Sequence, residues 1–417
     1  MKTTSIKNLI LSTVLVLGAA AASAQIGNTR YGTSAYPSLT GGGNSAFGAY
    51  ALNANTTGNY NTALGTAALY NNTSGSSNTS VGRWSLYSNT SGLNNTSIGA
   101  MSMYVNTTGV ENTAIGNSSL SQNTWGSYNT AVGVSSLNRN STGLFNTSSG
   151  AYSLYNNISG NDNTSSGYYS MYSNSQGGDN VATGMYSLYH NLSGNLNTAI
   201  GTSALISNTQ GNNNTANGAS ALSNNQYGNN NTAIGYNTGL GITNGSGNTI
   251  IGANVTGLPA SLTNTIILAD GTGNQRLYID NTGKTRIGSA ALTTPGIYKL
   301  YVETGILTEK IVVAVANSAT WADYVFDTNY KLMPLAEVAN FVQEHHHLPN
   351  VPSATEVVKS GLDLGMMDAK LLEKIEELTL YLIEQNNQNQ ELVNANKSLL
   401  KEVNDLKHRV TELETTK

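Results

Sequence analysis

Apolar, glycine and asparagine residues recur every 17 positions between Asn44 and Gly252, without one insertion or deletion. A leucine or methionine column stands at residues 52, 69, 86, 103, 120, 137, 154, 171, 188, 205 and 222. A constant short period with constant turn residues is typical of stacked units that contact only their neighbours. The pattern therefore predicts a mainly β protein whose centre is a parallel β-solenoid, or β-roll, of 17-residue repeats.

Seventeen residues are too few for a helix–turn–helix repeat, and Gly, Asn, Thr and Ser are poor helix formers. We expect two short strands per coil, one over Asn-Thr-Ala-Ile-Gly as at 112–116 and one over Ala-Leu-Tyr as at 68–70. Gly and Asn tolerate the left-handed conformations of the turns between them. Asn columns stacked at the coil spacing predict ladders of side-chain amides.

Each coil offers only about two large apolar residues, one from the leucine column and one from a column that starts at Leu64 and continues at 81, 98, 115 and 132. That second column turns polar at Ser149, Ser166, Thr183 and Asn217. So little apolar bulk hardly offsets the entropy of ordering a coil. The columns of small residues that begin at Ala63 and Ala68 would allow close approach of another chain. We therefore predict a homotrimer that closes its core around an axis.

The first residues have the features of an export signal. Lys2 and Lys7 precede an apolar run over 9–22, and Ala22-Ser23-Ala24 has the form of a cleavage site. We predict a signal peptide at 1–24, and no transmembrane segment in the mature chain because the run is shorter than a bilayer span. The rest divides into an N-terminal cap (25–43), the β-roll (44–258), a β connector (259–318), a small mixed or helical domain (319–366) and a coiled coil (367–417).

The two ends of the solenoid and the connector have their own signals. Asn28 repeats the motif before Asn44, and Asn264 repeats it after Asn248, each at a spacing one position shorter than the regular period. Short β-branched runs predict connector strands at 266–268, 276–279, 285–287, 299–302 and 310–315.

The C-terminal quarter predicts helices. Pro334 can begin a helix over 334–344, and Ser353 with Glu356 has the spacing of a capping box. A heptad pattern runs from about Asp368 to Leu413, and its core residues are Leu371, Ile375, Leu378, Leu382, Gln385, Asn389, Leu392, Asn396, Leu399, Val403, Leu406, Val410 and Leu413. This pattern specifies a coiled coil through which the chains oligomerise, although it does not choose between two strands and three.

Charge and composition exclude several function classes. The net charge is −4, only 10% of residues are charged, and there is no cysteine. No basic surface is available for nucleic acid. Ionisable groups between 41 and 257 are limited to Arg83, Arg139, His190, Glu111, Asp162 and Asp179. Because acid–base catalysis needs positioned titratable groups, we expect no enzyme and no cofactor.

Two columns are candidate ligand sites. Tyrosines at Tyr70, Tyr87, Tyr104, Tyr155, Tyr172 and Tyr189 could stack on glycan rings, or stack on one another and stabilise the solenoid. Strand alternation would place Tyr152, Tyr169 and Tyr186 on the opposite face. The threonine column from Thr62 to Thr249 could match ice if exposed, but we expect it to face inward.

The run His345-His346-His347 allows two interpretations. Three copies around an axis would gather many imidazoles for a metal ion. Adjacent helical residues point about 100° apart, however, so one chain cannot aim all three at one ion. We favour a role in ending the preceding helix.

Two resemblances complete the sequence evidence. The repeat Asn-Thr-Ala-Ile-Gly…Ala-Leu…Asn-Thr-Thr-Gly over 44–252 resembles the head repeats of trimeric autotransporter adhesins, although those repeats are shorter. That resemblance implies a trimeric left-handed β-roll that binds host matrix or other surfaces. The segments 321–326, 347–352, 362–365 and 372–381 resemble a C-terminal domain of tail-fibre-like surface proteins of Gram-negative bacteria.

Together these observations predict an exported, trimeric, fibrous protein with a structural or adhesive role. It would lie on the surface of a Gram-negative bacterium or outside the cell, with the periplasm as the other compartment, and would attach to a host, a glycan or another cell-surface ligand. The alternative is a ligand-binding module whose tyrosine or threonine ladder contacts a glycan receptor or ice.

Overall fold

The computed structural model describes residues 27–35, 41–294, 296–314 and 321–415, so the predicted signal peptide at 1–24 lies outside the described residues. The chain separates into two compact units, Met1–Ile306 and Leu307–Lys417. Each unit is considered by itself below.

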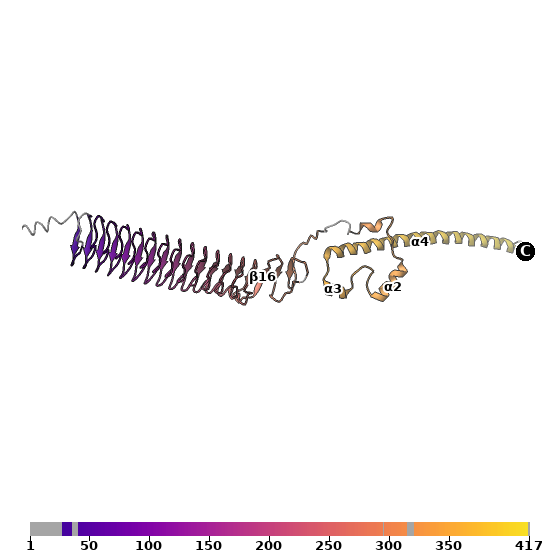
Figure 1. Cartoon of the computed structure of the whole chain (residues 1–417). Helices are drawn as coiled ribbons and strands as arrows, with labels where there is room; N and C mark the ends of the chain where they lie inside the picture. The colour runs from indigo at the N-terminus through magenta and orange to yellow at the C-terminus, as the bar shows by residue number, and fades with distance from the viewer. Residues whose placement is uncertain (1–26, 36–40, 295, 315–320, 416–417) are drawn as a thin grey trace, which may run out of the picture. The chain divides into compact units, whose positions relative to one another are not determined.

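The first unit is built around a parallel β-solenoid, as predicted (Figure 1). Each coil contributes one short strand, and each strand pairs in register with the equivalent strand of the next coil, as Thr113 pairs with Thr130. The solenoid strands are β1 (Thr29–Tyr31), β2 (Ser45–Phe47), β3 (Thr62–Leu64), β4 (Thr79–Val81), β5 (Thr96–Ile98), β6 (Thr113–Ile115), β7 (Thr130–Val132), β8 (Thr147–Ser149), β9 (Thr164–Ser166), β10 (Val181–Thr183), β11 (Thr198–Ile200), β12 (Thr215–Asn217), β13 (Thr232–Ile234), β14 (Thr249–Ile251) and β15 (Ile266–Ala269).

The predicted second strand of each coil is wrong. The Ala-Leu-Tyr segment at 68–70 lies in a turn, and Leu69 has a left-handed φ of 51°. The whole column from Leu52 to Leu222 shares this conformation. Positive φ is least tolerated by β-branched residues, which explains why the column contains Leu and Met but no Val or Ile. Backbone hydrogen bonds still join the turns, as from Leu69 N–H to the Ser85 carbonyl at 3.0 Å.

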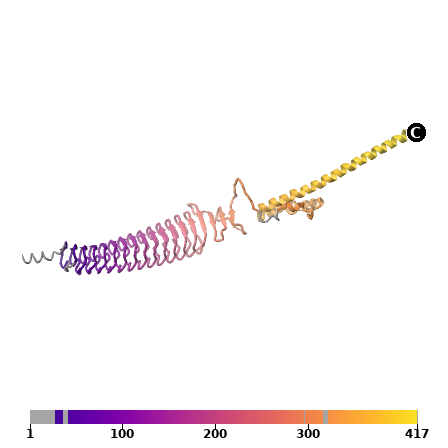
Figure 2. The same cartoon turned by 90° about the horizontal axis from the view of Figure 1, so that it is seen from above.

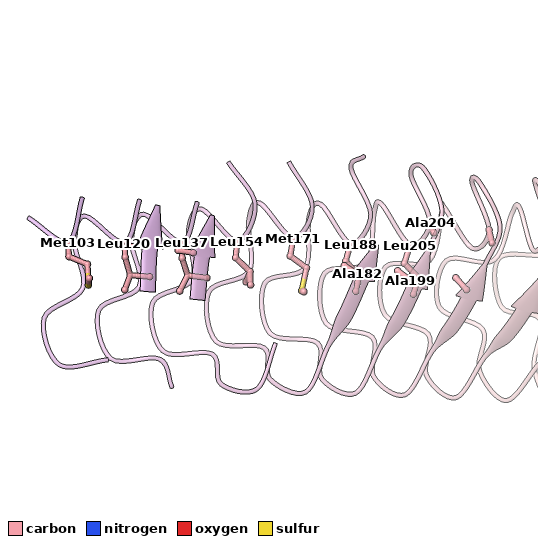
Figure 3. Packing of buried hydrophobic residues seen from close by; sticks show 14 of the residues in the cluster. Met103, Leu120, Leu137, Leu154, Met171, Ala182, Leu188, Ala199, Ala204 and Leu205 are labelled. Carbon is pink, nitrogen blue, oxygen red and sulfur yellow. The ribbon is translucent and has the colours of Figure 1, made fainter. Parts of the chain in front are cut away.

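The interior of each coil is filled by its own chain. The leucine and methionine side chains are completely buried, and the middle residue of each strand, such as Ala182 or Ala199, lies beside them (Figure 3). The columns that begin at Ala63 and Ala68 are therefore interior, which corrects the expectation that they form a surface for another chain. Small residues are required there because so short a coil encloses room for only one large side chain.

Two buried asparagine columns form the predicted amide ladders. Asn146 Oδ1 accepts hydrogen bonds from the backbone N–H of Asn163 at 3.1 Å and from its Nδ2 at 3.1 Å, while Asn146 Nδ2 donates to the Gly160 carbonyl at 2.8 Å. The second ladder ends at Asn225, whose buried Oδ1 lacks a partner because its next position along the column is Ile242. Each rung thus satisfies the turn backbone of its neighbour.

The two ends of the solenoid differ. Thr29 pairs with Ser45, which confirms the shortened spacing at the N-terminal end. At the far end the full spacing persists: Ile266 pairs with Thr249, and Thr265 N–H donates to Asn248 Oδ1. Thr265, not Asn264 as predicted, therefore occupies the asparagine position of the last coil.

A small mixed sheet continues from the last coil. β16 (Gln275–Ile279) pairs antiparallel with β15 and with β17 (Thr285–Ile287), and β18 (Leu300–Val302) pairs parallel with β17. These strands confirm most of the predicted connector. The strand predicted at 310–315 is wrong over its described part, because 310–314 form no strand.

The second unit is helical. It contains the 3₁₀ helix η2 (Ala322–Phe326), α2 (Leu335–His345), α3 (Ala354–Ser360) and α4 (Leu364–Thr415). Ser353 and Glu356 form the predicted capping box at the start of α3. Helix α4 has 52 residues, and its C-terminal half extends past the other helices of this unit (Figure 2). None of the described helices combines the length and the hydrophobicity needed to cross a bilayer.

Candidate functional site

The strands of the solenoid present an outward face with two columns. Along each strand from β2 to β15 the middle residue is buried, while the first and third point outward, as Thr62 and Leu64 do around Ala63. The third residues were expected in the core, yet the following are 38% to 50% exposed: Phe47, Leu64, Ile98, Ile115, Val132, Ile200, Ile234 and Ile251. The left-handed leucine of the turn fills the interior, so these side chains have no room inside. We call this surface the outer strand face.

The threonine column belongs to the same face. Its members from Thr62 to Thr249 are partly or fully exposed, which corrects the expectation that they face inward. Strand alternation explains both columns, because residues one position either side of a buried alanine must point the other way. Threonine and apolar side chains therefore alternate across an exposed parallel sheet.

The predicted tyrosine ladder is stacked. Tyr70, Tyr87 and Tyr104 form one column with ring centroids 5.0 and 5.2 Å apart. Tyr155, Tyr172 and Tyr189 form a second stack further along the same column, with spacings of 5.2 and 5.3 Å. Such spacing is the coil repeat itself, so stacking follows from the solenoid and does not by itself indicate a ligand.

The tyrosines at 152, 169 and 186 do not lie on the opposite face, as alternation had predicted. Their rings stack on one another at 5.0 and 5.8 Å, and Tyr169 lies 5.1 Å from Tyr172 in the neighbouring column. Tyr152 and Leu154 are both left-handed, so the segment is not extended and strand alternation does not apply. Tyr168, which the sequence reasoning missed, stands perpendicular to Tyr169 at 4.3 Å.

In the second unit, residues 321–334 pack against one face of α4. Ala322 and Val325 of η2 are buried, as are Ala369, Glu373 and Glu376 of α4. Tyr324 donates a hydrogen bond to Glu373 Oε2 at 2.5 Å, and Tyr330 donates to Glu377. The segments 321–326 and 372–381, quoted above for the tail-fibre-like resemblance, are thus in direct contact.

Charged residues on α4 shift the pKa values of the two groups in this contact. Burial alone would raise the pKa of Glu373, but hydrogen bonds from Lys370, Tyr324 and Lys374 lower it to about 2. The hydrogen bond to Glu373, with burial, raises the pKa of Tyr324 to about 12. The pair is therefore a phenol donating to a carboxylate throughout the physiological range. No signal in the sequence pattern identified it, because it joins residues 49 positions apart.

The heptad core of α4 is largely uncovered, and only its N-terminal part, Leu371, Ile375 and Leu378, lines a groove with Tyr330 and Met333 of this contact. Buried Glu373 and Glu376 lie on the outer side of the heptad, whereas the predicted oligomerisation residues are largely uncovered. Their exposure is 60% at Ile375, 57% at Leu378, 56% at Leu382, 60% at Leu392, 56% at Leu399, 47% at Val403, 55% at Leu406, 53% at Val410 and 72% at Leu413. Gln385, Asn389 and Asn396 are exposed on the same side. We call this row of residues the α4 seam.

An apolar groove of about 500 Å³ opens between α2 and the seam. Leu335 and Val338 of α2 line one side, and Leu371, Ile375 and Leu378 line the other. The groove is thus the N-terminal continuation of the seam, and its wall already contains core positions of the heptad.

The histidine run ends α2, as predicted. His346 is the C-cap residue with a left-handed φ of 60°, and its N–H donates to the Val342 carbonyl. His345 stacks on Phe341 at 4.2 Å, and the rings of His345 and His347 are 6.1 Å apart. Within the described ranges, no three His, Cys, Asp or Glu side chains lie close enough together to hold a metal ion.

Comparison of the chain with protein-family models, with curated proteins and with solved structures finds no match in any of the three. The surfaces described above are therefore the basis for functional inference.

Proposed function

We propose that the protein is an exported, homotrimeric surface fibre with a structural or adhesive role, in which the α4 seam joins three chains and the solenoid is displayed. The exposed seam is the observation that carries this proposal. Apolar residues repeated every 3.5 positions over several heptads are stable only when another helix covers them. Each leucine buried there stabilises the assembly by about 1.5–3 kcal/mol.

The groove beside α2 supports the same assembly. Its walls combine Val338 with the seam residues Ile375 and Leu378, and helix α2 does not fill it. A coiled coil continued toward the N-terminus of α4 brings the helix of a second copy to this point. That helix would cover Leu335, which is exposed in a single chain, and Val338, which is half-buried. Helix α2 would then pack against helix α4 of a neighbouring chain.

The outer strand face supports three solenoids side by side. Its apolar column, from Phe47 to Ile251, is exposed in one chain, and threonines flank it. If the apolar columns of three chains faced one another around the trimer axis, these side chains would be removed from water. The resemblance to trimeric adhesin heads favours three chains, whereas Val403 and Val410 at a positions with Leu at d positions would by themselves favour two.

Cysteine cross-linking tests the seam directly, because the chain has no cysteine of its own. Leu392→Cys, at a d position, is expected to form disulfide-linked chains under mild oxidation. The matched control is Ser398→Cys, a little further along on the outer side of the same exposed helix, which is expected to stay unlinked. Equal linking of both variants, or none at Leu392→Cys, would refute assembly through the seam.

Export and display depend on the predicted leader at 1–24 and on the two resemblances. An antibody raised against the solenoid should label intact producing cells. Labelling only after permeabilisation would place the protein inside the envelope and exclude an adhesive role at the surface.

Ice binding is a second candidate, favoured by one observation: the threonine column lies outward on a regular sheet, with one threonine on each rung from β3 to β14 except β10, where Val181 takes its place. This use of the outer strand face excludes packing of the solenoids against one another through that face, since both need the same side chains. Thermal hysteresis of the purified chain, abolished by Thr113→Leu with Thr130→Leu, would support it over the fibre proposal.

A further inference from the structure

Seven tyrosines form one continuous aromatic surface on three successive coils: Tyr152, Tyr155, Tyr168, Tyr169, Tyr172, Tyr186 and Tyr189. Two stacked columns run side by side, and rings of the same coil lie 5.9, 5.1 and 5.6 Å apart. We call this the tyrosine surface. It lies on the turn that follows the glycine closing each strand, and so its existence does not depend on the outer strand face or on the trimer.

The rings of the two columns are not free platforms. Interplanar angles of 8° to 15° within the columns mean that each ring covers the faces of its neighbours. What the columns offer outward is a row of ring edges and phenol hydroxyls, one per coil. Tyr168 differs, because its ring stands at 80° to Tyr169 and is 46% exposed. It is the residue that can present an aromatic face to a ligand.

The surroundings are polar and carry few charges; the Arg139 guanidinium lies 5.7 Å from the centre of the Tyr155 ring. Asn156, Ser173 and His190 follow the tyrosines of one column, and the strands of these coils end in Ser149, Ser166 and Thr183 instead of an apolar residue. Aromatic rings with hydroxyl and amide groups, and without a charged cluster, match the chemistry of a neutral sugar, whose C–H faces stack and whose hydroxyls accept and donate.

The spacing narrows the class of sugar. Phenol rings recur every 5.0–5.8 Å along the columns. An extended β-1,4-linked pyranose chain advances by a similar length per sugar, whereas an α-1,4-linked chain coils and loses this register. We propose that the tyrosine surface binds a neutral β-1,4-linked polysaccharide lying along the solenoid axis, with Tyr168 stacking on one sugar and the column hydroxyls bonding to its neighbours.

The test is calorimetric titration of the full chain with cellohexaose and with N-acetylchitohexaose, and with maltohexaose as the α-linked comparison. We expect binding of at least one β-linked hexaose and none of maltohexaose. Tyr168→Ala should weaken that binding about tenfold, which corresponds to about 1.4 kcal/mol. Absence of binding to both β-linked sugars, or equal binding of maltohexaose, would overturn the proposal.

The chain supplies its own control. Tyr70, Tyr87 and Tyr104 stack with the same spacing but without a second tyrosine column or a counterpart of Tyr168. Tyr87→Ala should leave sugar binding unchanged. Tyr155→Phe with Tyr172→Phe keeps the stacking and removes two hydroxyls, so it should weaken binding without lowering the melting temperature. Loss of binding in Tyr87→Ala would place the sugar site outside the tyrosine surface and overturn the proposal. Unchanged binding in both Tyr168→Ala and the double Phe variant would show that the rings of the tyrosine surface only stack.

Discussion

The solenoid and helix α4 place their leucines in opposite environments. Leu69 and Leu137 of the solenoid are completely buried by their own coil and its neighbours, whereas Leu392 and Leu406 of α4 are 60% and 55% exposed. The solenoid also satisfies its buried asparagine ladders within one chain, apart from Asn225 Oδ1 at the end of one ladder. One region is therefore complete as a single chain in its interior, and the other is not.

This difference changes the reason for expecting a trimer. The thin coil does not need a second chain to fill its core, since its small columns already line that core. What remains for a partner is the outer strand face and, above all, the α4 seam. We expect damage to the seam to dissociate the protein and damage to the solenoid to unfold coils without dissociating it. The following experiments test that division.

The largest effect is expected from charge in the seam. Leu392→Asp with Leu399→Asp removes two core leucines per chain, each contributing about 1.5–3 kcal/mol, and adds repelling carboxylates. We expect monomers by light scattering and loss of most helix signal in circular dichroism. Ser398→Asp is the control and should remain assembled. A trimer that survives the double change would contradict assembly through the seam.

The next largest effect is expected inside the solenoid. Asn146→Ala leaves the buried N–H of Asn163 without a partner, at about 1–3 kcal/mol, and removes one of the two donors to the Gly160 carbonyl, which keeps its hydrogen bond from Asn157. Asn195→Ala is the matched control, because Asn195 is exposed and water can replace its amide. The melting temperature should fall clearly for Asn146→Ala only. The molecular mass of the assembled protein should be unchanged in both variants. Dissociation of the Asn146→Ala variant into single chains would contradict the expectation that damage to the solenoid unfolds coils without separating the chains.

A smaller effect tests the left-handed leucine column. Leu137 has a φ of 51°, so Leu137→Ile places a β-branched residue where it is strained, at about 1–3 kcal/mol. Leu137→Met, a residue that the column already contains at Met103 and Met171, should cost under about 1.5 kcal/mol. Urea unfolding measures both. If isoleucine were tolerated as well as methionine, the conformation of the column would not explain its composition.

The smallest effect concerns pH at the contact between 321–334 and α4. The pKa of Glu373 is lowered from 4.5 to about 2, so its stabilising contribution is fully present above pH 4.5 and is lost as the pH falls toward 2. Fluorescence of Trp321, adjacent to η2, should report loosening in that window. Glu373→Gln should flatten the transition in this window, and an identical titration in that variant would show that another group is responsible.

The sequence predicted much of the fold because most of it is periodic. The 17-residue repeat, the asparagine ladders and the α4 heptad are each indicated by the same residue types at many equivalent positions. The predicted second strand failed because Leu69 adopts a left-handed turn, which composition alone does not distinguish from a strand. Two further predictions were wrong for the same reason: that the Leu64 column lies in the core, and that Tyr152 lies on the face opposite the other tyrosine column.

The candidate sites were less predictable. The spacing of the tyrosines along the sequence revealed the columns. That the two columns lie side by side, and that Tyr168 stands beside them, depends on the direction of the side chains in the turns, which the spacing does not give. The Tyr324–Glu373 contact joins distant segments with no shared period, so only the folded chain reveals it. The groove between α2 and the seam is likewise a product of tertiary packing.

The most direct test of the account is the molecular mass in solution of residues 25–417, measured by sedimentation equilibrium over a range of concentrations. The proposed trimeric fibre predicts a mass of three chains. A mass of one chain, with α4 still fully helical, would contradict the proposal that other copies of the protein cover the seam.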